Sequence, residues 1–195
     1  QKRFQDEGLT QNILEFYPGP FETFASEQKY DLILSIHSWY YIGYQIPELQ
    51  KALQLLSPNG LLLISMNASQ GFTTCLRKAV PLVEPTLNAE ELSAWVQDLG
   101  YPHVYFESHK NREVSHLLDR KGWTRQGKAW LSYVFRQEYD SLPEESKQKI
   151  FQFFSQAKAK KTDWEIYGSL LFEKQTLPEL EPNLTLPSRQ PADKL

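Results

Sequence analysis

The feature that most constrains this chain is an apolar run that ends abruptly in polar and aromatic side chains. Residues 30–42 read YDLILSIHSWYYI, and Leu32, Ile33 and Leu34 near the centre show no alternation of apolar and polar positions. A strand with one face in water alternates, whereas a strand covered by helices on both faces is apolar throughout. The run therefore predicts a central strand of a mainly parallel sheet in an α/β fold.

A second apolar run follows at the spacing of a βαβ unit. Residues 61–65, LLLIS, predict another buried strand, and the turn sequence SPNG at 57–60 precedes it. Between the two runs, leucines recur at helical spacing after Pro47, which suits the first turn of a helix. Two parallel strands joined by a helix form a right-handed crossover, so we expect both strands in one sheet.

The rest of the chain supplies the remaining elements of one domain, residues 1–174. Strands are predicted near 12–17, 103–108 and 164–173, the last antiparallel to its neighbours, and a helix begins at Asn88, where Glu91 completes a capping box. Residues 111–161 are rich in aromatics at helical spacing and predict a helical insertion. Residues 175–195 are proline-rich and predict a disordered tail.

Polar and aromatic side chains gather where the first apolar strand ends. In open α/β sheets ligands bind beyond the carboxyl ends of the strands, so this position predicts a small-molecule site. The residues there are Ser35, His37, Ser38, Trp39, Tyr40 and Tyr41. A structural interpretation stays open for each, because a histidine at a strand end often bonds only to the backbone and aromatic side chains also fill cores.

Composition narrows the classes of partner. The net charge is −3 with no long basic run, which argues against nucleic acid, and no apolar run is long enough to span a membrane. The only cysteine, Cys75, excludes an internal disulfide, and no Cys/His spacing suits a metal, so we expect a protein of the cytoplasm. Its oligomeric state stays open. The chain begins at Gln1 and contains one methionine, Met66, so we expect that it continues a longer protein.

These residues together resemble a known family. The order of strand 31–36, Tyr40-Tyr41, helix, the turn at 57–60 and strand 61–65 resembles the second half of a Rossmann-like (class I) S-adenosylmethionine-dependent methyltransferase. A helical insertion before an antiparallel last strand is similar to that family's closing elements. The aromatic run and Gly71-Phe72 resemble small-molecule members of the histamine N-methyltransferase type. The family's glycine-rich loop has no match, so the amino-terminal part of the fold is expected upstream of Gln1.

The resemblance implies a reaction and roles for particular residues. S-adenosylmethionine would be the cofactor, with Gly19, Pro20 and Phe21 on its adenine side and Ser35 and Ile36 on its methionine side. The implied substrate contacts are Trp39, Tyr40, Tyr41, Phe72 and Trp164. Direct in-line transfer to a small molecule, possibly an amine, needs little acid–base chemistry beyond a base, for which His37 is the first candidate and Glu165 the second.

Two other classes remain open at this stage. A nucleotide-dependent oxidoreductase would share the βαβ pattern, and its glycine-rich fingerprint would also lie upstream. A truncated, non-catalytic interaction module is the other alternative. We expect this chain alone to bind S-adenosylmethionine weakly or not at all.

Overall fold

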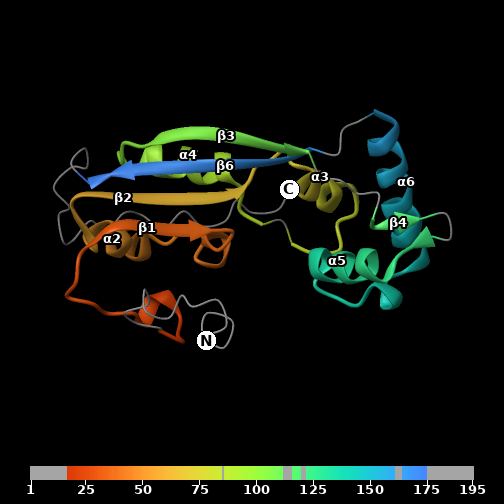
Figure 1. The fold of residues 1–195 in the computed structure, drawn as a ribbon, viewed down its shortest axis with the longest axis horizontal. Helices are drawn as coiled ribbons and strands as arrows, with labels where there is room; N and C mark the ends of the chain where they lie inside the picture. The colour runs from red at the N-terminus through yellow and green to blue at the C-terminus, as the bar shows by residue number, and fades with distance from the viewer. Residues whose placement is uncertain (1–16, 85, 112–115, 120–121, 161–163, 175–195) are drawn as a thin grey trace, which may run out of the picture.

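A four-stranded sheet forms the centre of the computed structural model, which describes residues 17–84, 86–111, 116–119, 122–160 and 164–174 (Figure 1). The strands lie in the order β1-β2-β6-β3. β1 is parallel to β2, while β6 is antiparallel to both β2 and β3, so three strands run one way and the last strand runs against them. This confirms the α/β fold with an antiparallel last strand. The bounds are Tyr30–Ile36 for β1, Leu56–Asn67 for β2, Val104–Asn111 for β3 and Trp164–Glu173 for β6.

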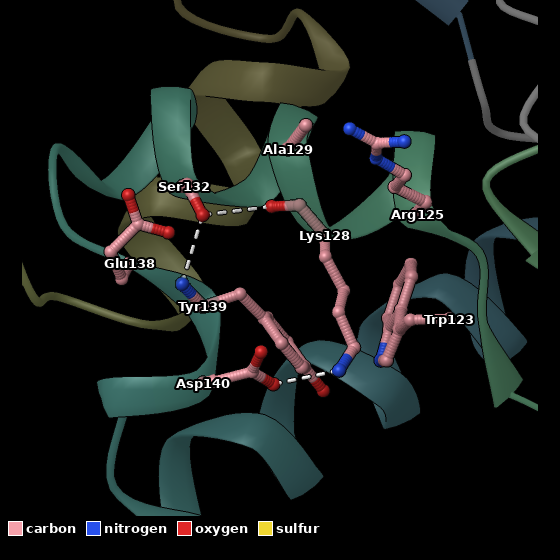
Figure 2. A pocket seen from close by; sticks show the side chains of 8 residues that line it. All are labelled: Trp123, Arg125, Lys128, Ala129, Ser132, Glu138, Tyr139 and Asp140. Atoms are coloured by element: carbon pink, nitrogen blue, oxygen red, sulfur yellow. Dashed lines mark hydrogen bonds and ion pairs between the residues drawn. The ribbon is translucent and has the colours of Figure 1, made fainter.

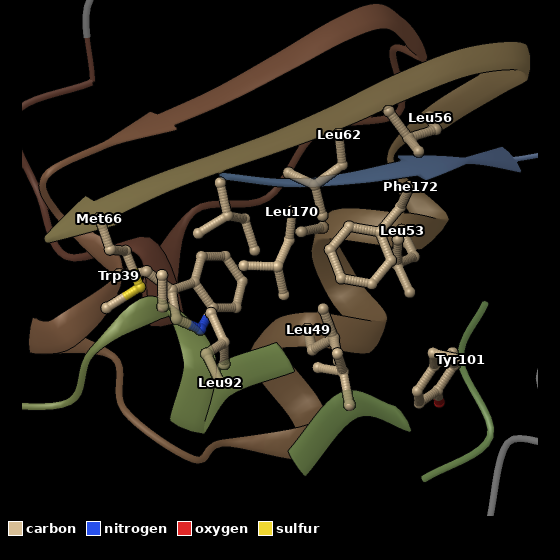
Figure 3. Packing of buried hydrophobic residues seen from close by; sticks show 14 residues of the cluster. Trp39, Leu49, Leu53, Leu56, Leu62, Met66, Leu92, Tyr101, Leu170 and Phe172 are labelled. Atoms are coloured by element: carbon tan, nitrogen blue, oxygen red, sulfur yellow. The ribbon is translucent and has the colours of Figure 1, made fainter. Parts of the chain in front are cut away.

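Two helices cover one face of this sheet, α2 (Ile46–Gln54) and α4 (Ala89–Asp98). Their leucines and valine pack against the alternate residues of β2 and β6 that face them, as Figure 3 shows for Leu49, Leu62 and Leu170. The predicted starts of both helices are confirmed. Pro47 lies in the first turn of α2, and the capping box predicted at the start of α4 is formed. Burial of these apolar side chains stabilises the contact between helices and sheet by roughly 1.5–3 kcal/mol each.

The opposite face of the sheet carries apolar side chains that are open to solvent in the described part of the chain. The register of the strands places five of them on this face, and their exposed fractions run from 44% to 56%. They are Leu32, Leu34 and Ile36 of β1 and Val104 and Phe106 of β3. Only Ile33, between the two leucines, packs against the helices.

The expectation that residues 32–34 form a central strand is therefore wrong for the described sheet, because β1 lies at its edge. An apolar run reports that both faces of a strand are apolar, but it carries no information about how many neighbouring strands are hydrogen-bonded to it.

A group of helices lies beyond the end of the sheet where β6 begins (Figure 1). The helical character expected between β3 and β6 is confirmed, whereas α3 and the small β4–β5 sheet were not expected. These elements share a second hydrophobic core, which includes Phe72, Leu131 and Phe154. The bounds are Phe72–Ala79 for α3, Leu118–Asp119 for β4, Gly122–Trp123 for β5, Arg125–Phe135 for α5, Tyr139–Ser141 for the 3-10 helix η4 and Glu144–Lys160 for α6.

The remaining expectations concern short segments. Phe21–Thr23 forms the 3-10 helix η2 and Trp39–Tyr41 the 3-10 helix η3. The residues of the predicted turn, 57–60, lie within the bounds of β2, but they bulge from its pairing with β1, which passes from Leu56 to Leu61 while β1 advances from Tyr30 to Leu32. The strand predicted at 12–17 lies outside the described residues except for Tyr17, which is not in a strand, and the tail at 175–195 also lies outside them. Among the described helices, none has the length and apolar character needed to cross a membrane.

Candidate active site

A cavity of about 630 Å³ lies at the carboxyl ends of β1 and β2, where α3 and α5 approach the start of β6. Its floor is set by the register of the sheet, because Asn67 and Tyr167 are paired residues of β2 and β6. Cavities of this size hold small molecules, and this is the position where open α/β sheets bind them. The lining residues are His37, Tyr40, Tyr41, Asn67, Thr73, Arg77, Trp130, Tyr133, Val134, Arg136 and Tyr167.

His37 enters the cavity from a strained position at the end of β1. Its φ is 51°, in the left-handed region that a non-glycine residue adopts at a cost of roughly 1–2 kcal/mol. The surrounding structure holds it there, because the His37 backbone N–H donates to the Ser65 carbonyl at 2.8 Å and the ring meets the Tyr167 ring edge-on at 4.9 Å. Backbone strain of this kind is concentrated at functional sites.

The three aromatic residues after His37 divide between the cavity and the core. They form η3, and this turn directs Trp39 into the helix-covered core, where it is 2% exposed (Figure 3). Tyr40 and Tyr41 line the cavity, with ring centroids 5.0 Å apart. The implied substrate contact at Trp39 is corrected, because the 3-10 turn directs this ring into the core and away from the cavity.

Helix α3 is fixed against the start of β6 by a buried carboxylate. Glu165 is 1% exposed and accepts hydrogen bonds from the Thr73 hydroxyl at 2.8 Å and from the Thr73 backbone N–H at 3.4 Å. A carboxylate at the first turn of a helix is favoured by the helix dipole. Gly71 permits this close approach, since a Cβ there would lie 2.9 Å from the Ile166 carbonyl oxygen.

This arrangement gives Glu165 a place different from the one expected. Glu165 does not line the cavity but lies behind Thr73, which does. Phe72 is also corrected: it is 2% exposed and packs against Phe153 and Phe154 in the second core. Both residues therefore shape the cavity by holding α3 in place.

The positions expected to hold a cofactor lie outside the cavity lining. Ser35 bonds Ser38 through their hydroxyls at 2.8 Å, and Ile36 is exposed on the open face of the sheet beside His37. Gly19 and Pro20 are exposed, and Phe21 packs near the Lys51 ammonium, 5.1 Å from its ring centroid. The side chain of Trp164 falls among those that the structure does not describe, although its backbone begins β6. The roles of these residues stay predictions.

Two arginines that the sequence did not single out give the cavity its charge. Arg77 comes from α3 and Arg136 from the residue that ends α5, and the lining contains no aspartate or glutamate. Burial lowers the pKa of Arg77, and the neighbouring charge of Arg136 lowers it further. Burial, together with Tyr133 and Tyr41, raises the pKa of Tyr40 to about 12, so this phenol is a neutral hydrogen-bond donor.

A second cavity, of about 500 Å³, lies by the turn between α5 and η4 and contains one ion pair (Figure 2). Lys128 lies 2.7 Å from the Asp140 carboxylate, and its ammonium stands 5.6 Å from the centre of the Tyr139 ring. Ser132 donates to the Lys128 carbonyl and accepts from the Tyr139 backbone N–H. These contacts give Lys128, Ser132, Tyr139 and Asp140 structural roles. Within the described residues, no cluster of three or more His, Cys, Asp and Glu suits a metal ion.

No family model and no curated protein matches this sequence. Among solved structures, the chain is similar to a protein described as a candidate sarcosine dimethylglycine methyltransferase from Galdieria sulphuraria, with 13% identity and a TM-score of 0.45 over 89% of this chain and 63% of that one. It is also similar to the plantazolicin methyltransferase BpumL in complex with a desmethylPZN analogue and SAH, with 13% identity and a TM-score of 0.40 over 85% of this chain and 62% of that one. The chain thus spans less than two thirds of either structure.

Proposed function

We propose that the cavity is the acceptor site of an S-adenosylmethionine-dependent methyltransferase that acts on a small molecule. The observation that carries the proposal is the placement of antiparallel β6 between β2 and β3, with a ligand-sized cavity at the carboxyl ends of β1 and β2. An antiparallel last strand following a helical insertion is the feature by which the sequence resembles this family. Neither alternative class is favoured by a specific contact in the cavity.

Several positions that the resemblance assigns to the cofactor are open to solvent. Ile36 offers an exposed apolar side chain directly before His37, and Gly19 and Pro20 are exposed at the start of η2. Ser35, Ile36 and the segment 19–21 are the positions that would hold it. When bound, the cofactor supplies a methyl group on a positively charged sulfur, which is intrinsically reactive.

The chain's own residues then have two tasks. Tyr40, Tyr41 and Tyr133 line the cavity with rings and hydroxyls, and they position the acceptor. His37 lies at the strand end and accepts the proton that an amine or phenol acceptor loses as it is methylated. An amine acceptor would react in its neutral form, because only that form has a free electron pair.

The test measures formation of the demethylated cofactor, S-adenosylhomocysteine, by mass spectrometry with a panel of small amines and phenols. It uses this chain and a form extended upstream of Gln1. We expect turnover of at least one acceptor, and a loss of about 10²-fold in His37→Asn, since general base catalysis contributes about 10²–10⁴-fold. Asparagine is chosen because it tolerates the left-handed backbone of residue 37.

The matched control is His109→Asn, because His109 is an exposed histidine of β3 beside Glu107 and outside the cavity lining. It should leave turnover unchanged. Absence of product in both forms of the protein, together with no binding of S-adenosylhomocysteine by calorimetry, would refute the proposal.

A further inference from the structure

Two cations and no acidic side chain line the candidate cavity. Arg77 and Arg136 both line it, and neither forms an ion pair with an acidic side chain among the described residues. In the second cavity the cation Lys128 lies against Asp140. Proteins bring two guanidinium groups together without a carboxylate at a cost, because the like charges repel.

Arg77 is held in a fixed orientation by its own neighbours. Its Nε donates to the Val134 carbonyl at 3.0 Å and one terminal nitrogen donates to the Thr86 hydroxyl at 3.3 Å. The guanidinium is therefore anchored on one side between α3 and α5 while it also lines the cavity. An anchored guanidinium loses little freedom on binding an oxyanion, and its planar donors match the geometry of a carboxylate or phosphate.

Arg136 reaches the cavity from a position where glycine is the usual residue. It ends α5 in the left-handed conformation, with φ 53°, and its side chain is exposed. A glycine there would avoid the strain of the left-handed backbone. The presence of a long cationic side chain at this strained turn is explained when that side chain has a ligand.

The buried carboxylate at the start of β6 does not line the cavity. Glu165 lies behind Thr73, and its carboxylate is engaged with the Thr73 hydroxyl and backbone N–H. The neutral phenol of Tyr40 adds a hydrogen-bond donor close to both arginines. The described lining thus combines two cations, neutral donors and aromatic rings.

We propose that the methyl acceptor carries an oxyanion, a carboxylate or a phosphate, which Arg77 and Arg136 bind while its ring or chain lies against the aromatic lining. This inference rests on the proposed function, because it assigns the cavity to the acceptor. It narrows the acceptor class: an ammonium without an acidic group is repelled by this cavity, whereas an amino acid, an aromatic acid or a phosphorylated small molecule fits it. The other possible source of the same anion is the carboxylate of the cofactor.

The experiment compares three probes of one shape by calorimetry: 4-hydroxyphenylacetate, its neutral alcohol tyrosol and its amine tyramine. We expect the acid to bind about tenfold more tightly than the alcohol and the amine to bind most weakly, since one charge-assisted contact contributes about 1.5–3 kcal/mol. Arg136→Gln should weaken the acid about tenfold and leave the alcohol unchanged. Arg125→Gln, an exposed arginine that lines the other cavity, is the control and should change neither.

Arg77→Lys keeps the charge and serves as the second variant, because Arg77→Gln also removes contacts that hold α3 to α5. We expect intermediate affinity for the acid. Equal binding of acid and alcohol, or an acid affinity that Arg136→Gln does not change, would overturn the inference. So would weaker binding of S-adenosylhomocysteine, instead of the acid, in Arg136→Gln, because the arginines would then serve the cofactor.

The two proposals fail separately. Acid binding through the arginines with no methyl transfer to any acceptor would overturn the proposed function and leave the anion site standing. Methyl transfer to uncharged acceptors that is insensitive to both arginines would overturn the anion site and leave the function standing.

Discussion

Replacement of Thr73 by valine tests whether the buried carboxylate of Glu165 fixes α3 to the sheet. The valine side chain keeps the shape of threonine but removes the hydroxyl that donates to Glu165 at 2.8 Å. Glu165 is 1% exposed, so water does not readily replace the lost donor. Hydrogen bonds to charged groups contribute about 1.5–3 kcal/mol, and we expect the free energy of unfolding to fall by about 2 kcal/mol.

Serine at position 73 separates the hydrogen bond from packing. It keeps the hydroxyl and removes one methyl group from a residue that is 7% exposed, which costs about 0.8 kcal/mol. The expected order of stability is therefore wild type, then Thr73→Ser, then Thr73→Val. Thr74→Val changes the next residue of the same helix, a half-buried threonine, and should shift stability by less than about 0.5 kcal/mol.

Equilibrium unfolding in urea measures these differences. With a slope of about 2 kcal/mol per molar urea, a loss of 2 kcal/mol lowers the midpoint by about 1 M. A Thr73→Val protein as stable as Thr73→Ser would refute the reasoning, because it would show that the carboxylate does not depend on this donor.

Two further predictions concern the cavity. Arg136→Gly should raise the free energy of unfolding by about 1 kcal/mol, since glycine relieves the strain of the left-handed backbone. The same change should weaken binding of 4-hydroxyphenylacetate. Lower stability in urea unfolding would contradict this prediction. Alkaline unfolding should report Tyr40, whose pKa rises from 10 to about 12 in the folded chain. The unfolded state loses this proton first, so stability is complete below pH 10 and falls as pH rises to about 12. Tyr40→Phe should make that fall shallower, and an unchanged slope would contradict the shift.

The elements that local sequence specifies were the ones predicted correctly. The apolar runs of β1 and β2, Pro47 in α2 and the capping box at Asn88 depend on neighbouring residues, and each is found. The position of β1 at the edge was not predictable in this way, because an apolar run reflects what covers the faces of a strand and not which strands pair with its edges. The strand bounds at 57–60 were also missed, because β2 continues past these residues although its pairing with β1 passes directly from Leu56 to Leu61.

The residues of the cavity also fall into those that the sequence predicted and those that it did not. His37, Tyr40 and Tyr41 follow directly from the end of an apolar strand, and the structure brings them to one cavity. Arg77 and Arg136 come from helix ends that meet only after α3 and α5 pack together, so no local spacing relates them. Neither arginine stands out in the sequence, because cationic residues near the end of a helix are favoured by the helix dipole.

The central place of β6 has a consequence for the order in which this chain folds. Its residues bond to β2 and β3 on either side, and the pair Ser65 and Ser169 is separated by 104 positions in sequence. During synthesis β2 and β3 emerge early, but both lack β6, the neighbour that they share, until residues 164–173 have left the ribosome. Pairings of such long sequence separation form slowly, because the intervening loop must first be closed. The cavity floor at Asn67 and Tyr167 is therefore assembled among the last contacts, and a nascent chain stopped before residue 164 would have helices and strands but no ligand site.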